Sequence, residues 1–302
     1  MTTGLSVEVA GLLREAGLDP HDVERVIRLA IDEDLGGGED LTSAATIDPG
    51  DTSTADYVVR QPGVVAGIPV LAAALEIGLA GAGTVDLRIG DGARVARGDI
   101  VATVTAPTIP LLVVERTSLN ILCRLSGIAT ATRRWVDAVS STTAQVRDTR
   151  KTTPGLRHLE KYAVRCGGGV NHRIGLFDAV LIKDNHVASA GGVGPALDAV
   201  HARYLGRDLV IEVEVDDLDQ LDVALAHGAN EILLDNMSVA DMAEAVRRVR
   251  AAKPGVRIEA SGGLTVDTAA AVAATGVDYL AVGALTHSSP ILDIALDFRP
   301  SS

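Results

Sequence analysis

Cysteine and aromatic residues are both scarce in this sequence. Among 302 residues there are two cysteines, Cys123 and Cys166, and aromatic residues make up 2%. Two cysteines exclude a disulfide scaffold and are typical of a reducing compartment. So few aromatic side chains exclude stacking platforms for nucleic-acid bases, and they require a core of Ala, Val, Leu and Ile.

Positive charge and uninterrupted apolar runs are scarce as well. The 27 basic residues are outnumbered by 40 acidic ones, and this net charge of −13 disfavours binding to nucleic acid. The most apolar stretch, residues 64–83, contains Pro69, Glu76 and several glycines, so we expect no membrane span. Residues 1–19 lack the pattern of a signal peptide. We therefore expect a cytoplasmic protein that binds neither nucleic acid nor membranes.

The first third of the chain mixes helical and β-type patterns. Apolar residues at helical spacing predict a helix over 23–35, and short β-type runs separated by turns fill residues 55–107. Pro107 and Pro110 then suggest a boundary. We predict an N-terminal α/β sandwich domain over residues 1–115, with the C-terminal tail, 289–302, packed on it.

The rest of the chain alternates between strand-like and helix-like segments. After a long helical segment, 114–139, six apolar runs recur, and most of the later ones are separated by helix-like stretches. The runs are 144–147, 179–182, 209–215, 231–234, 256–260 and 279–282. This alternation predicts parallel βα units, and no Gly-x-Gly-x-x-Gly follows the first run to favour an open dinucleotide-binding sheet. The predicted fold class is therefore α/β, with an incomplete (β/α) barrel of about six parallel strands over residues 116–288.

Polar residues stand at the ends of all six predicted strands. Barrel active sites lie at the carboxyl ends of the strands, so these residues are the candidate site. They are Asp148–Lys151, Lys183–His186, Glu212 with Glu214, Asp235 with Asn236, Ser261–Gly263, and Gly283 with Ala284. The last two groups combine glycine with a following helix-like stretch, which predicts a phosphate site.

Basic residues concentrate between Arg147 and His186, where there are eight against four acidic ones. In an acidic protein such a cluster is typical of a site for a compact polyanion. We assign that role to Arg150, Lys151, Arg173 and Lys183, whereas Arg157 and Arg165 fit a solvated helix face equally well.

Glu212 and Glu214 lie two residues apart on one strand and therefore face the same side, the barrel interior. We expect the deeper Glu212 to pair with a buried cation such as Lys183. Glu214 and Asp235 are expected to hold Mg²⁺, directly or through water, or sugar hydroxyls.

Long strings within these segments resemble the quinolinate phosphoribosyltransferase family. They include Glu115-Arg116-Thr117, Thr149–Arg157, Asn171-His172-Arg173, Leu181–His186, Glu212-Val213-Glu214, Asp235-Asn236-Met237, Glu259–Gly263 and Gly283–Ser288. The similarity covers nearly the whole chain in order. One departure is an extra residue in the turn within 33–42, away from the expected chemistry.

The resemblance implies a reaction in which quinolinate and phosphoribosyl pyrophosphate give nicotinate mononucleotide, pyrophosphate and CO₂, with Mg²⁺. It implies that Lys151, Lys183, Glu214 and Asp235 are catalytic. Substrate contacts are implied for those four and for Arg116, Thr149, Arg150, His172, Arg173, Ser261, Gly262, Gly263, Val282, Gly283 and Ala284. In the family Arg116 reaches the neighbouring subunit's site, so the resemblance also implies a homodimer.

Other interpretations stay open at this point. Lys183 at a strand end fits a Schiff-base aldolase, and a relative that acts on another pyridine would share most of these motifs. The hairpin at 90–99 is similar to a carrier domain, but it has no lysine at its turn. Cys166 could be a nucleophile although no base has a clear spacing to it, and His287 could position a phosphate loop or be structural.

Overall fold

Two units, each with its own sheet, make up the computed structural model, which describes residues 4–300. The first unit contains residues 4–133, 152–168 and 285–300, and the second contains 134–151 and 169–284. The division falls inside one helix, α5 (Thr108–Ala138), which follows β5 without a loop. Pro110 lies in the first turn of this helix, where a missing N–H is tolerated, so the prolines do not interrupt the chain there.

The first unit is built on an antiparallel sheet in the order β12-β1-β5-β3. Tyr57 of β1 faces Ala102 of β5 on one side and Leu296 of β12 on the other. Its ring is fully buried and its hydroxyl lies 2.8 Å from the Ser118 hydroxyl of α5. The C-terminal tail therefore supplies an edge strand of this sheet.

Helices and short strands complete the first unit. The predicted helix at 23–35 is α2, which begins at Pro20 after the capping carboxylate of Asp19 and ends at Gly36 in a left-handed conformation. The elements are α1 (Val7–Glu15), α2 (Pro20–Leu35), α3 (Leu41–Thr46), β1 (Thr52–Val59), β2 (Gly63–Val64), α4 (Ile68–Gly78), β3 (Thr84–Leu87), β4 (Arg94–Val95), β5 (Ile100–Pro107), most of α5, α6 (Arg157–Cys166), α12 (Ala284–His287) and β12 (Ile294–Phe298).

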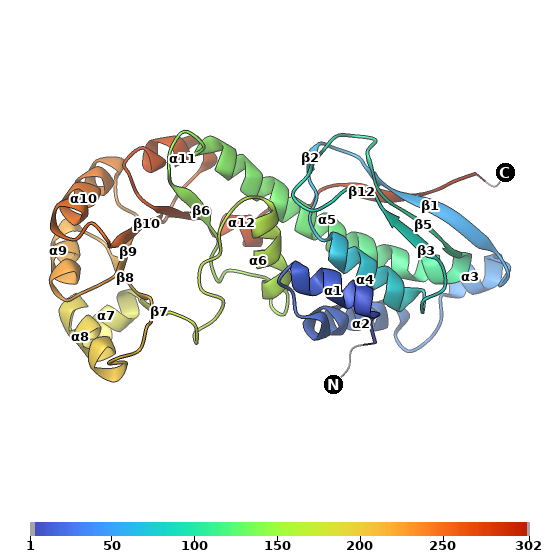
Figure 1. Cartoon of the computed structure of the whole chain (residues 1–302), viewed down its shortest axis with the longest axis horizontal. Helices are drawn as coiled ribbons and strands as arrows, with labels where there is room; N and C mark the ends of the chain where they lie inside the picture. Colours follow the sequence, from blue (N-terminus) through green and yellow to red (C-terminus); the bar gives the residue numbers. More distant parts are fainter. Residues whose placement is uncertain (1–3, 301–302) are drawn as a thin grey trace. The chain divides into compact units, whose positions relative to one another are not determined.

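The second unit contains the predicted parallel sheet. Its strands run in the order β6-β11-β10-β9-β8-β7, so all six predicted strands are confirmed. Figure 1 shows its larger helices, α8 to α11, on the outside of the curved sheet. The elements are β6 (Gln145–Arg147), β7 (Val180–Ile182), α7 (Asp184–Ala190), α8 (Val193–Arg203), β8 (Ile211–Val215), α9 (Leu218–Ala226), β9 (Glu231–Asp235), α10 (Val239–Ala252), β10 (Arg257–Ser261), α11 (Val266–Ala273) and β11 (Tyr279–Ala281).

The barrel is incomplete, as predicted, and it is open between β6 and β7. Within residues 4–300 these two strands do not pair with each other, and each has a single neighbour in the sheet. Val170 instead forms an isolated parallel bridge with Arg147 of β6. We call this opening the seam.

The most apolar segment of the sequence contains α4, a helix of 11 residues whose side chains are mostly buried in the first unit. Over residues 4–300, no helix combines the length and the apolar character needed to cross a membrane.

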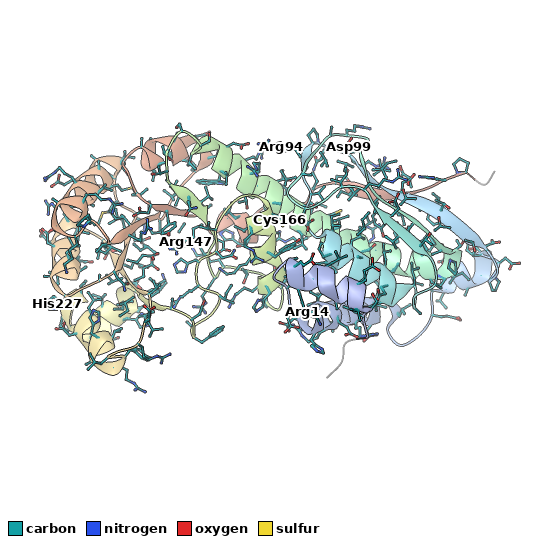
Figure 2. All side chains as sticks on the ribbon, in the orientation of Figure 1. Arg14, Arg94, Asp99, Arg147, Cys166 and His227 are labelled. Carbon is teal, nitrogen blue, oxygen red and sulfur yellow. The ribbon has the colours of Figure 1, made fainter. Side chains whose placement is uncertain are left out.

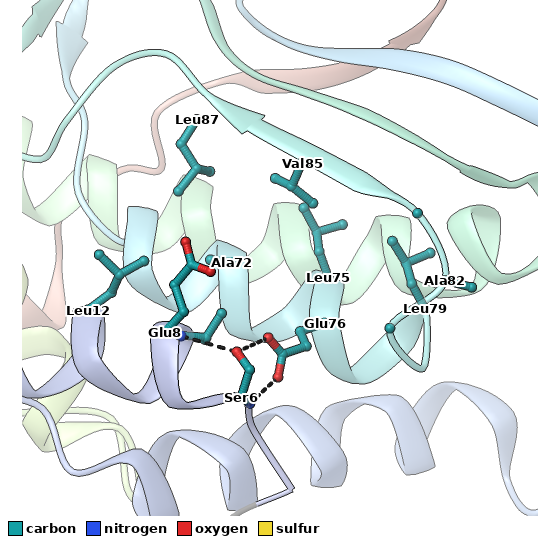
Figure 3. Close-up of a pocket in the computed structure, with 13 residues that line it drawn as sticks. Ser6, Glu8, Leu12, Ala72, Leu75, Glu76, Leu79, Ala82, Val85 and Leu87 are labelled. Carbon is teal, nitrogen blue, oxygen red and sulfur yellow. Dashed lines mark hydrogen bonds between the residues drawn. The ribbon is translucent and has the colours of Figure 1, made fainter.

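A pocket of about 290 Å³ lies among α1, α4 and β3 (Figure 3). Four leucines are among its lining residues, and at one side the hydroxyl of Ser6 donates to the carboxylate of Glu76 over 2.7 Å. None of the polar strand ends of the predicted barrel lines this pocket.

Replacing Gly127 with alanine should destabilise the first unit by at least about 2 kcal/mol. A Cβ at this position would lie 2.1 Å from the carbonyl oxygen of Pro290 and 2.7 Å from Cα of Ile291, which are backbone atoms that cannot rotate away. Urea unfolding measures the loss. Gly11→Ala is the matched control: nothing lies within 4 Å of its Cβ, so this helical site should gain about 0.5–1 kcal/mol. Equal effects of the two substitutions would contradict the packing argument.

Candidate active site

The carboxyl ends of the parallel strands bring the predicted phosphate loop against the end of β9. Gly262, which follows β10, has a φ of +84°, and a Cβ there would lie 2.2 Å from Oδ1 of Asn236. The N–H of Asn236 donates to the carbonyl oxygen of Ser261 over 3.0 Å. This turn therefore requires glycine twice over, for its left-handed conformation and for its close approach to Asn236. Gly263 also has a positive φ, and Thr265 caps α11 directly after it.

A layer of buried ionisable side chains lies in the barrel interior below this edge. The guanidinium of Arg147 on β6 pairs with Glu231 of β9 and, over 2.7 Å, with Glu259 of β10. It also stacks 4.0 Å from the ring centroid of Tyr279. Figure 2 labels Arg147 inside the curve of the second unit. Arg147 therefore serves the barrel interior, although it belongs to the basic cluster of the sequence.

Burial sets the protonation of this layer. Desolvation, reinforced by the charge of Glu212, raises the pKa of Glu259 to about 8, and desolvation with the charge of Glu231 raises the pKa of Glu212 to about 8. Glu212 is 1% exposed and Glu259 is fully buried. Each has one carboxylate oxygen, Oε1, without a hydrogen-bond partner among the described residues.

Glu259→Gln should flatten the dependence of stability on pH. A folded pKa of about 8, above the ordinary 4.5, gives stability that is full below about pH 4.5 and is lost as the pH rises through 8. The wild-type free energy of unfolding should thus fall more steeply than that of the variant between about pH 5 and 8. Urea titrations across that range test this.

The control for this prediction is Glu244→Gln on the surface of α10. Hydrogen bonds from Arg247 and Arg248 lower the pKa of Glu244 to about 2, so its contribution is lost only as the pH falls below its ordinary range. This control should leave the slope between about pH 5 and 8 unchanged. A Glu259→Gln slope identical to wild type would contradict the raised pKa.

The loop 171–173 is fixed to the end of β6 by the fully buried Asp148. One carboxylate oxygen of Asp148 accepts the His172 backbone N–H over 2.8 Å, and the other accepts the Asn171 side-chain amide over 2.6 Å. Arg173, at the end of this loop, donates from its guanidinium to the carbonyl oxygen of Ala179 over 3.1 Å. The loop is thus held on both sides before any ligand binds.

The guanidinium of Arg173 is poised for an anion. Desolvation, together with the nearby charge of Arg150, lowers the pKa of Arg173. Its Nε is buried and has no acceptor within the described residues. A half-buried cation that is close to a second cation and has an unused donor is complementary to a carboxylate.

Lys183 pairs with Glu214, and this corrects one prediction. Its ammonium lies 2.7 Å from Oε2 of Glu214, whereas Glu212 contacts His172. The prediction that Glu212 pairs with Lys183 was wrong because Lys183 follows the carboxyl end of β7, level with Glu214 and beyond the deeper Glu212. Desolvation and the charge of Glu214 raise the pKa of Asp235 on the next strand. Two carboxylates that repel each other in this way, beside the predicted phosphate loop, fit the oxygen ligands that Mg²⁺ prefers.

The remaining predicted residues are distributed over both units. Thr149 accepts the backbone N–H of Lys151 over 3.1 Å, and the N–H of Val282 donates to the carbonyl oxygen of Arg147 over 2.9 Å. Gly283 and Ala284 end the second unit, two and three residues after β11, and α12 begins at Ala284. Arg116 belongs to the first unit, and its side chain is 62% exposed.

Two further residues considered from the sequence also belong to the first unit. Burial raises the pKa of the Cys166 thiol to about 12, which is unsuited to a nucleophile. His287 is exposed, and its Nδ1 lies 2.6 Å from the Ser288 hydroxyl.

Comparison with known proteins covers both units. Residues 40–126 match the N-terminal domain of quinolinate phosphoribosyl transferase, and residues 128–297 match its C-terminal domain. The chain belongs to the quinolinate phosphoribosyltransferase family. A nicotinate-nucleotide pyrophosphorylase (carboxylating) of Mycobacterium leprae is 54% identical over 90% of this chain and 95% of its own length. A probable enzyme of the same name from Synechocystis is 41% identical over 87% of this chain and 88% of its own.

A solved relative has the same architecture. The nicotinate-nucleotide pyrophosphorylase of Francisella tularensis superposes with a TM-score of 0.85 at 36% identity, over 92% of this chain and 96% of its own. The predicted membership of the quinolinate phosphoribosyltransferase family and the predicted fold class are therefore confirmed.

Several residues that organise this quinolinate phosphoribosyltransferase site were missed from the sequence. Asn171 and Asn236 stand inside the recognised strings and Asp148 directly precedes one of them, but none was given a specific role, and Glu259 and Arg147 were not assigned to a buried layer. An acidic residue between two apolar ones in a strand, as Glu259 is between Ile258 and Ala260, was the available signal.

Proposed function

We propose that this protein transfers phosphoribosyl from phosphoribosyl pyrophosphate to quinolinate with decarboxylation, as a step of NAD biosynthesis. The observation that carries the proposal is the Arg173 guanidinium, half-buried near Arg150 with an unused Nε donor, in a chain of this family. Quinolinate carries two carboxylates on a planar ring, and planar guanidinium groups bind carboxylates in two-point contacts. Lys151, in the segment that follows β6, is assigned to the same substrate.

The chemistry needs positioning and charge rather than a covalent enzyme intermediate. The bond from C1 of the ribose to pyrophosphate breaks, and the pyridine nitrogen forms the new bond to C1. Cationic character at C1 is stabilised by the carboxylates Glu214 and Asp235. The ring nitrogen then bears a positive charge, the bond to the adjacent carboxylate breaks, CO₂ leaves, and the electron pair left on the ring carbon takes up a proton.

The ribose 5-phosphate is assigned to the loops after β10 and β11, at Ser261, Gly262, Gly263, Gly283 and Ala284. The two glycines after β10 leave backbone N–H groups accessible beside the beginning of α11. Glu214 and Asp235 would hold Mg²⁺, which when bound neutralises charge on the pyrophosphate. Lys183, paired with Glu214, faces the same group.

The assembly and location form part of this proposal. Arg116, exposed in its own chain, is assigned to the active site of a second copy in a homodimer. Both cysteines are free thiols, which supports a reducing, cytoplasmic location.

Product analysis tests the activity. Purified protein is mixed with phosphoribosyl pyrophosphate, Mg²⁺ and either quinolinate or nicotinate, and nucleotide and CO₂ are measured. Nicotinate mononucleotide and CO₂ from quinolinate alone are expected. Product from nicotinate alone would identify a relative with another base, and no product from folded protein would reject the proposal. The Schiff-base alternative predicts borohydride trapping of a sugar phosphate on Lys183, whose amine is engaged by Glu214 over 2.7 Å.

A further inference from the structure

Both ring nitrogens of His172 are engaged inside the protein. Its Nδ1 lies 2.7 Å from the backbone nitrogen of Arg173, and its Nε2 lies 2.8 Å from Oε2 of Glu212. A backbone N–H can only donate, so Nδ1 must accept and cannot itself carry a proton. The ring proton therefore sits on Nε2 and is donated to Glu212. This fixes one neutral tautomer.

The proton on Nε2 also bears on whether His172 and the neighbouring carboxylates could bind a metal ion. Donor atoms of His172, Glu212 and Glu259 all lie within 4.8 Å of one another, a spacing that a metal ion could bridge. A metal on Nε2 would require the ring proton to move to Nδ1, where the N–H of Arg173 already points. The trio is therefore a hydrogen-bonded group built around a histidine N–H.

We propose that His172 is a neutral positioning residue that holds Arg173 for the substrate carboxylate, and that it is not itself a cationic ligand of the substrate. The contacts run from Glu212 through the His172 ring to the backbone of Arg173. Glu212 fixes the ring through Nε2, with Oε1 of Glu259 at 3.7 Å from the same nitrogen, and the ring fixes the backbone of Arg173 through Nδ1. The His172 side chain is 9% exposed, so the ring is largely closed to solvent.

The charged groups around this ring come from several elements, and the neutral form rests on the acceptor role of Nδ1 rather than on their charges. Asp148 at the end of β6 holds the His172 backbone, and Glu212 of β8 and Glu259 of β10 face Nε2. Arg147 and Glu231 form the next layer behind Glu259, where Arg147 balances two of the carboxylates. Arg173 adds a positive charge next in sequence, which opposes a second one on the ring.

Nitrogen NMR tests the tautomer directly. The seven histidines of the chain are labelled with ¹⁵N, and the His172 signals are assigned by their loss in His172→Gln. The two ring nitrogens should show the shifts of a neutral ring protonated at Nε2 between about pH 6 and 8, with and without quinolinate. A doubly protonated ring, or a proton on Nδ1, in either state would overturn the proposal. The substrate-free spectrum needs no activity, so it is independent of the proposed function on which the role of Arg173 rests.

Two substitutions separate a positioning role from a charge role. His172→Gln keeps a neutral N–H donor for Glu212, whereas His172→Lys keeps only a positive charge. We expect KM for quinolinate to rise about tenfold in His172→Gln and about a hundredfold in His172→Lys, with KM for phosphoribosyl pyrophosphate little changed in both. The reverse order, with lysine the better replacement, would show that the ring acts as a cation. If one of the two variants unfolds, as seen by circular dichroism, the loss of signals in the other still assigns the His172 nitrogens and the NMR measurement decides.

Discussion

Arg173→Ala should lower kcat/KM for quinolinate by two to three orders of magnitude while the protein stays folded. Removing one partner of a half-buried charge pair with a carboxylate costs about 2–5 kcal/mol, and each 1.36 kcal/mol is a factor of ten. The fold should survive because Asp148 holds the loop through Asn171 and the His172 backbone, without the Arg173 side chain. Steady-state kinetics against both substrates measure the loss.

A matched control is Arg247→Ala on α10. Its side chain is 70% exposed and pairs with Glu244 at the surface, so both activity and stability should stay near wild type. If Arg173→Ala were as active as this control, the carboxylate assignment would be wrong. A loss confined to KM for phosphoribosyl pyrophosphate would place Arg173 at the phosphate end of the site instead.

Arg147→Met should lower the free energy of unfolding by about 3–5 kcal/mol. The side chain of Arg147 is 14% exposed and those of Glu231 and Glu259 are 7% and 0% exposed, so its loss leaves two buried carboxylates without their cation. Urea unfolding at about pH 9, above the raised pKa of Glu259, measures the effect. The deficit should shrink as the pH falls, because the orphaned carboxylates then take up protons.

The compensating variant makes this prediction specific. Combining Arg147→Met with Glu231→Leu and Glu259→Met replaces the ion group by apolar side chains, and it should recover most of the lost stability. A single variant that loses less than about 1 kcal/mol would show that the ion pairs contribute little to the fold.

The fold could be predicted largely from local patterns. Strands that are buried on both faces, such as Ile211–Val215 and Glu231–Asp235, appear in the sequence as short runs rich in apolar residues. The alternation of such runs with helix-like stretches predicts a parallel sheet. Polar residues at the carboxyl ends of these strands located the edge of the sheet at which the candidate site lies. The patterns could not predict which side chains form ion pairs. Whether Lys183 contacts Glu212 or Glu214 depends on the relative register of β7 and β8, and no local pattern specifies that register.

The layer of buried ionisable residues in the barrel interior could not be predicted from the sequence for a related reason. Arg147 and the glutamates Glu231 and Glu259 are far apart in sequence, and each is unremarkable alone. Only the sheet order β6-β11-β10-β9 places them together in the barrel interior. His172 shows the same limit, since its tautomer follows from a 2.7 Å contact with the next residue's backbone.

The seam between β6 and β7 has a consequence for solubility. A closed ring has no strand edges, but an open one leaves two rows of backbone N–H and C=O groups that could template the addition of a strand from another molecule. Here the bridge from Val170 to Arg147 caps part of the β6 edge, and β7 is only three residues long. Short or covered edges of this kind offer few backbone groups for hydrogen bonds with a strand of another molecule. The open barrel should therefore not promote aggregation by edge-to-edge strand pairing.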